Sequence, residues 1–445
     1  MKKLLILLTI LSAAPVLANP DPFSVYTDAT PQGCISAPEH RDTYTLPELI
    51  QIGICNNPAL NRSFMAVRSA QADKGDALSS YLPTLTATGS ISQTHTHIES
   101  TESGNTYPYA GNIALSWLIY DFGGRSATTA QMQAYLDSAQ FNYNAKLHDM
   151  VLAINQAYFD SLSAQEVLKS TESSAASFKK SYEESVKRFE LGLVSASDKL
   201  LAKTSYDQSL LDVVTAKNTL KKAQGALSIL LNLNPDVALT VTTPPKDRDL
   251  TALATDETVS DMMETALSLR PELKAKQSDL TASERAIEIA RAAGLPSLSA
   301  SAKAGWDDSW KRHNNGQFGT SSGLSLSFPL FTGFSDTYRV ARARFDYRQA
   351  ALAVAETQDS VRADVWNSYQ DYTTAVEAHT LSTNMLESAV ENERVAFRSY
   401  QVGKGSILEL LTAGSQLATA RQQVIVAFYD VLTSKAALYR AIGRF

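Results

Sequence analysis

Few side chains in this 445-residue sequence have the types and spacing that catalysis requires. No glycine-rich phosphate loop follows an expected strand, and no G-x-S-x-G nucleophile motif occurs. His95 and His97 share one face of an expected strand, but no third ligand for a metal is evident nearby. We therefore expect no catalytic residue, no metal and no cofactor, and we predict that the protein is not an enzyme.

Two acids stand in a pattern that positions charge at the start of a helix. Asp198 and Glu409 each follow a serine by three residues, in the runs that begin at Ser195 and Ser406. This spacing is that of a capping box, in which the serine and the acid satisfy backbone amides of the first helical turn. Both boxes come shortly after a glycine, where such caps belong.

The N-terminus and the cysteines indicate export. A basic start, an apolar run and small residues before a cleavage point predict a signal peptide over residues 1–18, followed by an N-terminal extension over 19–45. Cys34 and Cys55 are the only cysteines, and an oxidising compartment is compatible with a disulfide between them. Such a bond would tie the extension to the first helix.

Charge and hydropathy exclude two further classes. The net charge is -6 and the lysines and arginines are scattered, so we expect no binding to nucleic acid. No apolar run after the signal peptide is long enough for a transmembrane helix. The mature chain is then either soluble or enters a membrane as β-structure.

The second half of the sequence repeats the motifs of the first half in the same order, at an offset of 211 to 213 residues. The paired motifs are Asn57-Pro58 with Arg270-Pro271, Leu82-Pro83 with Leu295-Pro296, and Phe189-x-x-Gly192 with Tyr400-x-x-Gly403. A collinear series of this kind indicates a duplication. We place the two copies at residues 46–233 and 259–443, joined by a linker over 234–258.

Each copy predicts a helix, two strands, a long helix and a shorter helix. In the first copy the helices are expected over 46–80, 124–190 and 197–231, and a polar loop over 99–106 separates the strands; in the second copy the long helix is expected over 336–401. Strict alternation predicts strands over 84–94, 107–120, 297–307 and 318–331. Each strand has an apolar face and a face of serine, threonine and glycine, which suits a membrane barrel with a wet lumen. Four strands cannot close a barrel, so several chains would have to share one.

The ordered motifs, present twice, resemble the TolC family of outer-membrane factors over nearly the whole mature chain. The resemblance implies a mainly α fold with a membrane β-barrel: an internally duplicated protomer, three copies of which form a 12-stranded barrel in the outer membrane of a Gram-negative bacterium and a long α-helical barrel across the periplasm. It implies an exit duct for efflux or type I secretion. The implied partners are two further copies of the chain, outer-membrane lipid, a periplasmic adaptor, and an inner-membrane transporter of the ABC, RND or MFS type.

The resemblance also assigns residues that hold the periplasmic tip closed. The gating tyrosine of the family corresponds to Tyr400, and its partner aspartate corresponds to Asp198. The gating arginine of the family falls on Gly405, with Lys404 beside it. Breaking a cross-helix hydrogen bond at such a tip would let the helices part.

The resemblance places a pore constriction close by. The first acid ring of the family corresponds to Glu409 and the second to Thr412, so one of the two rings is missing here. Three carboxylates around a narrow axis would favour cations. For Glu409 and for Asp198 the functional role and the capping role both remain open on the sequence.

A second function class fits part of the sequence. A secreted coiled-coil or adhesin-like protein would explain the signal peptide and the long helices, but not the strand pairs inserted at matching points of both copies. Within the duct hypothesis, the sequence does not distinguish a drug from a polypeptide as cargo.

Overall fold

The computed structural model describes residues 43–98, 101–236, 239, 241–242, 257–309 and 316–444. The expected signal peptide, Cys34 and most of the linker over 234–258 lie outside these residues. The elements of the first copy are α2 (Leu46–Asn56), α3 (Pro58–Ser79), β1 (Thr84–Ile91), β2 (Thr94–Ile98), β3 (Thr101–Thr106), β4 (Pro108–Tyr120), α4 (Gly124–Glu190) and α5 (Ala196–Leu230). Those of the second copy are α6 (Val259–Leu269), α7 (Pro271–Ala292), β5 (Ser297–Ser309), β6 (Gln317–Ser327), α8 (Ser335–Gln401) and α9 (Ile407–Ile442).

Equal helix lengths confirm the duplication. The helices α2 and α6 both have 11 residues, α3 and α7 both have 22, and α4 and α8 both have 67. A helix of 67 residues is about 100 Å long. Among the described residues, no helix combines the length and the apolar character that crossing a bilayer requires.

The chain divides into two compact units, and neither unit is one of the sequence copies. Unit 1 contains the described parts of 65–140 and 275–355, and unit 2 contains those of 43–64, 141–274 and 356–445. The helices α4 and α8 contribute residues to both units. Each unit therefore takes half of its chain from each copy.

A proline divides the first predicted helix. The sequence predicts one helix over 46–80, but the structure has α2 and α3 with a break at Asn57. Asn57 is extended, with φ -69° and ψ 121°, because a residue before proline avoids the α conformation. The second copy breaks in the same way at Arg270, with φ -60° and ψ 124° before Pro271.

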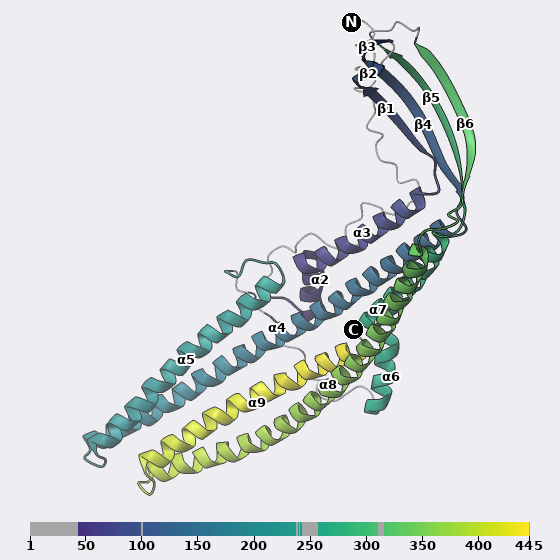
Figure 1. Ribbon diagram of the computed structural model, residues 1–445. Coiled ribbons are helices and arrows are strands. Elements are labelled where there is room, and N and C mark those ends of the chain that lie inside the picture. Colours follow the sequence, from purple (N-terminus) through teal and green to yellow (C-terminus); the bar gives the residue numbers. More distant parts are fainter. Residues whose placement is uncertain are drawn as a thin grey trace. The chain divides into compact units, whose positions relative to one another are not determined.

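The sheet of unit 1 joins the two copies (Figure 1). Its strand order is β1-β4-β5-β6, and every neighbouring pair is antiparallel. The central pair, β4 with β5, combines the second strand of the first copy with the first strand of the second copy. The strands β1 and β6 lie at the two edges.

The first predicted strand and the loop after it are partly wrong. The predicted strand 84–94 ends at Ile91, and the chain then forms a separate two-stranded sheet of β2 and β3. The strand β3 lies within the predicted polar loop 99–106. Polar side chains do not prevent a strand there, because the pairing is made by backbone groups.

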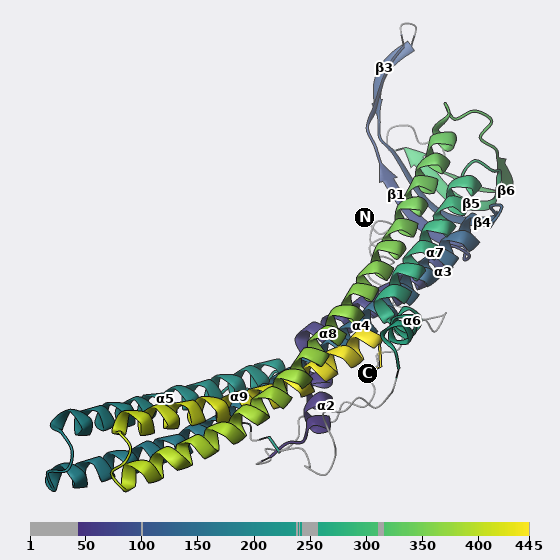
Figure 2. The ribbon, with the colours of Figure 1, turned by 90° about the horizontal axis from the view of Figure 1, so that it is seen from below.

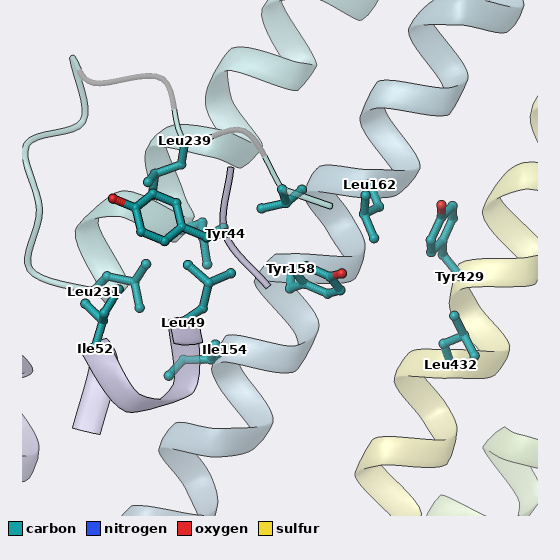
Figure 3. Packing of buried hydrophobic residues seen from close by; sticks show 12 residues of the cluster. Tyr44, Leu49, Ile52, Ile154, Tyr158, Leu162, Leu231, Leu239, Tyr429 and Leu432 are labelled. Atoms are coloured by element: carbon teal, nitrogen blue, oxygen red, sulfur yellow. The ribbon is translucent and has the colours of Figure 1, made fainter. Parts of the chain in front are cut away.

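The main core of unit 2 packs α2, α4, the end of α5 and α9 together (Figure 3). Leu49 of α2, Ile154 of α4 and Leu231 after α5 are completely buried. Gly53 allows the close approach of α2 to α4, because a Cβ there would lie 2.4 Å from Cδ1 of Ile154. Tyr44 adds a bridge to Val241, and the Thr242 N–H donates to the carbonyl of Tyr44 at 3.1 Å.

A network of charged groups connects four helices of unit 2. The buried guanidinium of Arg270 donates to Asp364 of α8 at 2.8 Å and to Glu272 of α7 at 3.3 Å. Arg440 of α9 donates to Glu272 at 2.6 Å and to Asp149 of α4. Burial opposes ionisation of Glu272, but the two guanidinium groups beside it lower its pKa below the ordinary value of 4.5. The network therefore depends on an ionised Glu272.

Removing the buried cation is expected to destabilise unit 2. In Arg270→Gln, Glu272 and Asp364 lose a charged donor, which should cost about 3 kcal/mol, the low end of the range for broken buried pairs because Asp364 is 47% exposed. The control Arg285→Gln breaks an exposed pair with Glu288 and should leave the free energy of unfolding almost unchanged. Chemical denaturation of the purified variants measures the free energy of unfolding of each. Equal losses in Arg270→Gln and Arg285→Gln would contradict the role of Arg270 as the buried cation that stabilises unit 2.

The same variant should show a defined pH dependence. Because the folded-state pKa of Glu272 is lowered, its contribution is complete above pH 4.5 and is lost as the pH falls through that lowered pKa. The difference in unfolding free energy between the wild-type protein and Arg270→Gln should therefore shrink below pH 4.5. Denaturation series at pH 7 and pH 3.5 test this, and a difference that grows on acidification would exclude Glu272 as the titrating group.

Candidate channel surfaces and tip residues

The two faces of the main sheet differ in chemistry, as the strand alternation predicts. Rows of paired residues on one face are largely apolar, for example Leu85–Leu115–Ala302 and Leu298–Leu326. Rows on the other face are small and polar, for example Thr84–Ser116–Ser301–Gly323. Leu324 and Leu326 are 71% and 70% exposed in the single chain. This exposed apolar surface is suited to contact with lipid, and the opposite face is suited to water.

Two hairpin turns lie together at one end of unit 2, one between α4 and α5 and one between α8 and α9 (Figures 1 and 2). Each turn has a glycine with positive φ, 71° at Gly192 and 75° at Gly403. Only glycine adopts this conformation without strain, so the two glycines end the long helices in the same way. This end, defined by the turns over 191–195 and 402–406, is called the tip below.

Both acids at the tip cap their own helices. The Asp198 N–H donates to Ser195 Oγ at 3.1 Å, and the Ser195 N–H donates to the Asp198 carboxylate at 3.1 Å. Glu409 and Ser406 form the same pair of bonds at 3.1 and 3.2 Å. Glu409 also remains exposed, so capping uses its carboxylate without burying it. A pore-facing role for Glu409 stays a prediction.

Tyr400 is placed away from hydrogen-bonding partners. Its ring is 2% exposed and packs in an apolar cluster with Ala202, Ile407, Leu410 and Leu411. Its hydroxyl is buried and has no hydrogen-bond partner among the described residues, so the structure does not join it to Asp198. The pairing of Tyr400 with Asp198 as a gate also stays a prediction.

The remaining predicted tip residues are exposed. Lys404 and Thr412 are both on the surface of unit 2. Beside Lys404 the turn is tight, because the amides of Lys404 and Gly405 both donate to the carbonyl of Ser399, at 2.9 and 3.0 Å. A Cβ at Gly405 would lie 3.1 Å from the Cβ of Ser399. Of the two predicted cysteine partners, Cys55 lies on α2, and Cys34 lies outside the described residues.

One face of α9 forms a polar surface that the sequence reasoning missed. Its exposed members recur at alternating spacings of three and four residues: Glu409, Thr412, Gln416, Thr419 and Gln423. Asp430 lies two turns beyond on the same face and is near Asp160 of α4. Burial raises the pKa of both aspartates, and the charge of Asp430 raises that of Asp160 further. A helical periodicity count of polar residues could have found this surface, called the α9 polar face below.

Arg188 is a second group that the sequence reasoning missed. It lies in the last turn of α4, and its guanidinium is 4.7 Å from the centre of the Tyr400 ring. It also donates to the carbonyl of Gln401 at 2.9 Å. Nothing in the sequence indicates a contact between residues so far apart, because the spacing within each copy says nothing about the packing of one copy on the other.

Together, paired long hairpins and a four-stranded sheet with one apolar and one polar face define a channel-type outer-membrane protein. The family model for the outer membrane efflux protein matches residues 49–233 and 262–444, and the chain belongs to that family. The resemblance to TolC proteins is confirmed, because the chain is 25% identical to the Escherichia coli outer membrane protein TolC over 89% of this chain and 82% of that protein. It is also 25% identical to the protein CyaE of Bordetella pertussis, over 92% and 86% of the two chains.

The fold is that of solved channels of this kind. The Campylobacter jejuni CmeC outer membrane channel superposes with a TM-score of 0.77 at 20% identity, covering 89% of this chain and 85% of that chain. The protein is accordingly an exit duct located in the outer membrane and extending into the periplasm. The family and its structural neighbours are channels rather than enzymes.

The capping boxes make a prediction about the tip. Ser406→Ala removes the acceptor for the Glu409 N–H, which should cost about 1 kcal/mol locally. That amide should then exchange its hydrogen roughly fivefold faster. Ser415→Ala, at an exposed serine of the same helix, is the control and should leave the exchange of the Glu409 amide unchanged. Equal hydrogen-exchange rates of the Glu409 amide in Ser406→Ala and Ser415→Ala would show that the Ser406 cap does not stabilise this turn.

Proposed function

We propose that three copies of this chain form one passive conduit that serves a tripartite efflux or type I secretion system. The conduit receives its substrate from an inner-membrane transporter through a periplasmic adaptor and releases it outside the cell. The single observation that carries the proposal is the four-stranded sheet, which has two open edges and an exposed apolar face. No catalytic step, metal or cofactor is part of the proposal.

The edges of the sheet support an assembly of several chains. Among the described residues, β1 pairs only with β4 and β6 pairs only with β5. An unpaired edge leaves N–H and C=O groups without partners, which hydrocarbon does not tolerate. Pairing β6 of one copy with β1 of the next satisfies both edges. Three copies then give twelve strands, a number within the range of outer-membrane barrels.

The helices of unit 2 support the same assembly. Leu200, Leu211 and Val214 of α5 are 58%, 61% and 64% exposed in the single chain. Exposed apolar side chains gathered on one helix mark an interaction surface, and in the assembly a neighbouring copy packs against it. The α9 polar face would then be available to line a water-filled passage, with Glu409 at its tip end.

Two cargo classes fit this conduit. The family description favours small molecules, since it is that of efflux proteins. A passage lined by the α9 polar face is also suited to an extended polypeptide. Comparing sensitivity to toxic small molecules with the loss of secreted polypeptides in a deletion strain separates the two.

Planar-bilayer conductance of the purified full-length protein tests the proposal. We expect channels of low conductance and cation selectivity, blocked by multivalent cations. The informative variant is Glu409→Gln, because a glutamine also serves a capping box and only the charge is lost. Cation selectivity should fall several-fold while the thermal stability of the trimer is unchanged.

Two different results would contradict the role of Glu409 and the conduit itself. An unchanged selectivity in Glu409→Gln, with channels still present, would leave Glu409 as a cap only. A wild-type protein that forms no channel and stays soluble without detergent would overturn the conduit and favour the secreted coiled-coil alternative.

A further inference from the structure

Next to the apolar cluster of the tip, one long side chain adds a hydrogen bond and a cation–ring contact between the two hairpins. Arg188 belongs to the first copy, at the end of α4, and both of its cross-contacts are to the end of α8 in the second copy. Its Nη2 donates to the backbone carbonyl of Gln401 at 2.9 Å, and its guanidinium carbon lies 4.7 Å from the centre of the Tyr400 ring. Arg188 therefore contacts the last turn of α8 in two ways, through the backbone carbonyl of Gln401 and through the ring of Tyr400.

The environment makes this contact stronger than an ordinary surface pair. The side chain of Arg188 is 14% exposed, and the Tyr400 ring is almost completely buried. Screening by water is weak at such sites, so a cation over a ring face and a charge-assisted hydrogen bond both gain strength. The hydroxyl of Tyr400 adds nothing, because it has no partner among the described residues.

Among the described residues, the equivalent positions of the other copy make no such connection. At the offset of 211, Tyr400 corresponds to Phe189 and Arg188 corresponds to Ser399. Phe189 also has a cation over its ring, Lys199 at 4.3 Å, but that lysine belongs to the same hairpin, and the ring is 36% exposed. Two similar cation–ring contacts thus lie at the tip, and only the one made by Arg188 joins the hairpins.

Arg188 also has an alternative partner on its own helix. Its Nε lies 3.8 Å from the carboxylate of Glu184, one turn earlier in α4. If the two turns separate, Glu184 can retain the guanidinium, so that release does not leave an unpaired charge. The connection can therefore open and close at a modest cost.

We propose that Arg188 is the latch of the tip. It holds the α4–α5 turn against the α8–α9 turn through its contacts with the Tyr400 ring and the Gln401 carbonyl. The tip opens when these two contacts break. This inference rests on the proposed conduit. It assigns the restraint to the face of the Tyr400 ring and not to the Tyr400 hydroxyl.

Conductance of the full-length trimer in planar bilayers tests the latch. Arg188→Gln should raise the mean conductance several-fold, whereas Arg188→Lys, which keeps the charge and a donor, should stay closer to the wild type. Lys199→Gln is the matched control, because it removes the cation that acts within one hairpin, and it should leave conductance unchanged.

Two variants of the ring identify which part of Tyr400 acts. Tyr400→Phe should conduct like the wild type, because it removes only an unpaired hydroxyl. Tyr400→Leu should conduct more than the wild type but no more than Arg188→Gln, because the hydrogen bond from Arg188 to the Gln401 carbonyl remains. The double variant should conduct like Arg188→Gln, since the ring contact is one of the contacts that Arg188→Gln already removes. If Tyr400→Phe opened the channel as much as Tyr400→Leu, the hydroxyl would be the restraint and the latch would be wrong.

A second measurement does not depend on conduction. Spin labels on Leu193→Cys and Lys404→Cys, both exposed and one on each turn, report the separation of the turns in a background with Cys34 and Cys55 replaced by serine. The distance distribution should lengthen in Arg188→Gln and not in Lys199→Gln. An unchanged distribution, together with wild-type conductance in Arg188→Gln, would overturn the latch while the channel itself persists. Absence of any wild-type channel would instead be the failure of the proposed conduit.

Discussion

The antiparallel pairing of β4 with β5 is made between the two copies of the duplicated sequence, and it decides how the rest of the chain can be arranged. Each of these strands leads directly into or out of a helix of the same copy, so the pairing brings the helices of both copies into one unit. Neither copy retains a complete sheet when separated from the other. The two copies are therefore interleaved and do not form two tandem domains.

Equivalent positions in the two copies have the same backbone but different chemistry. Asn57 and Arg270 both interrupt a helix before a proline with nearly identical dihedral angles. The Asn57 side chain donates to the carbonyl of Leu230 and caps α3, whereas Arg270 is the centre of a charged network. Phe189 and Tyr400 diverge likewise, one partly exposed and the other buried. The two copies therefore share backbone geometry at these positions, while the contacts that the side chains make differ.

Sequence patterns predicted the elements better than their contacts. Alternation along 297–307 and the proline-free stretch 124–190 identified strands and helices, because both patterns reflect local periodicity. The break at Pro58 was equally local and could have been predicted, because a residue before proline avoids the α conformation. The strand β3, with the sequence TESGNT, has no alternation of apolar and polar residues. Its pairing with β2 is made by backbone groups, which leave no pattern in the sequence. The contact of Arg188 with the α8 end, 213 residues away, depends on how the copies pack and could not be predicted from either copy alone.

The tight turn at Gly405 limits which residue types this position accepts. A Cβ there would lie 3.1 Å from that of Ser399, so any side chain requires the neighbouring atoms to move by a few tenths of an ångström. A lysine or arginine at position 405 would therefore begin from a crowded turn, whereas Arg188 reaches the same turn from the neighbouring hairpin without adding a side chain to it.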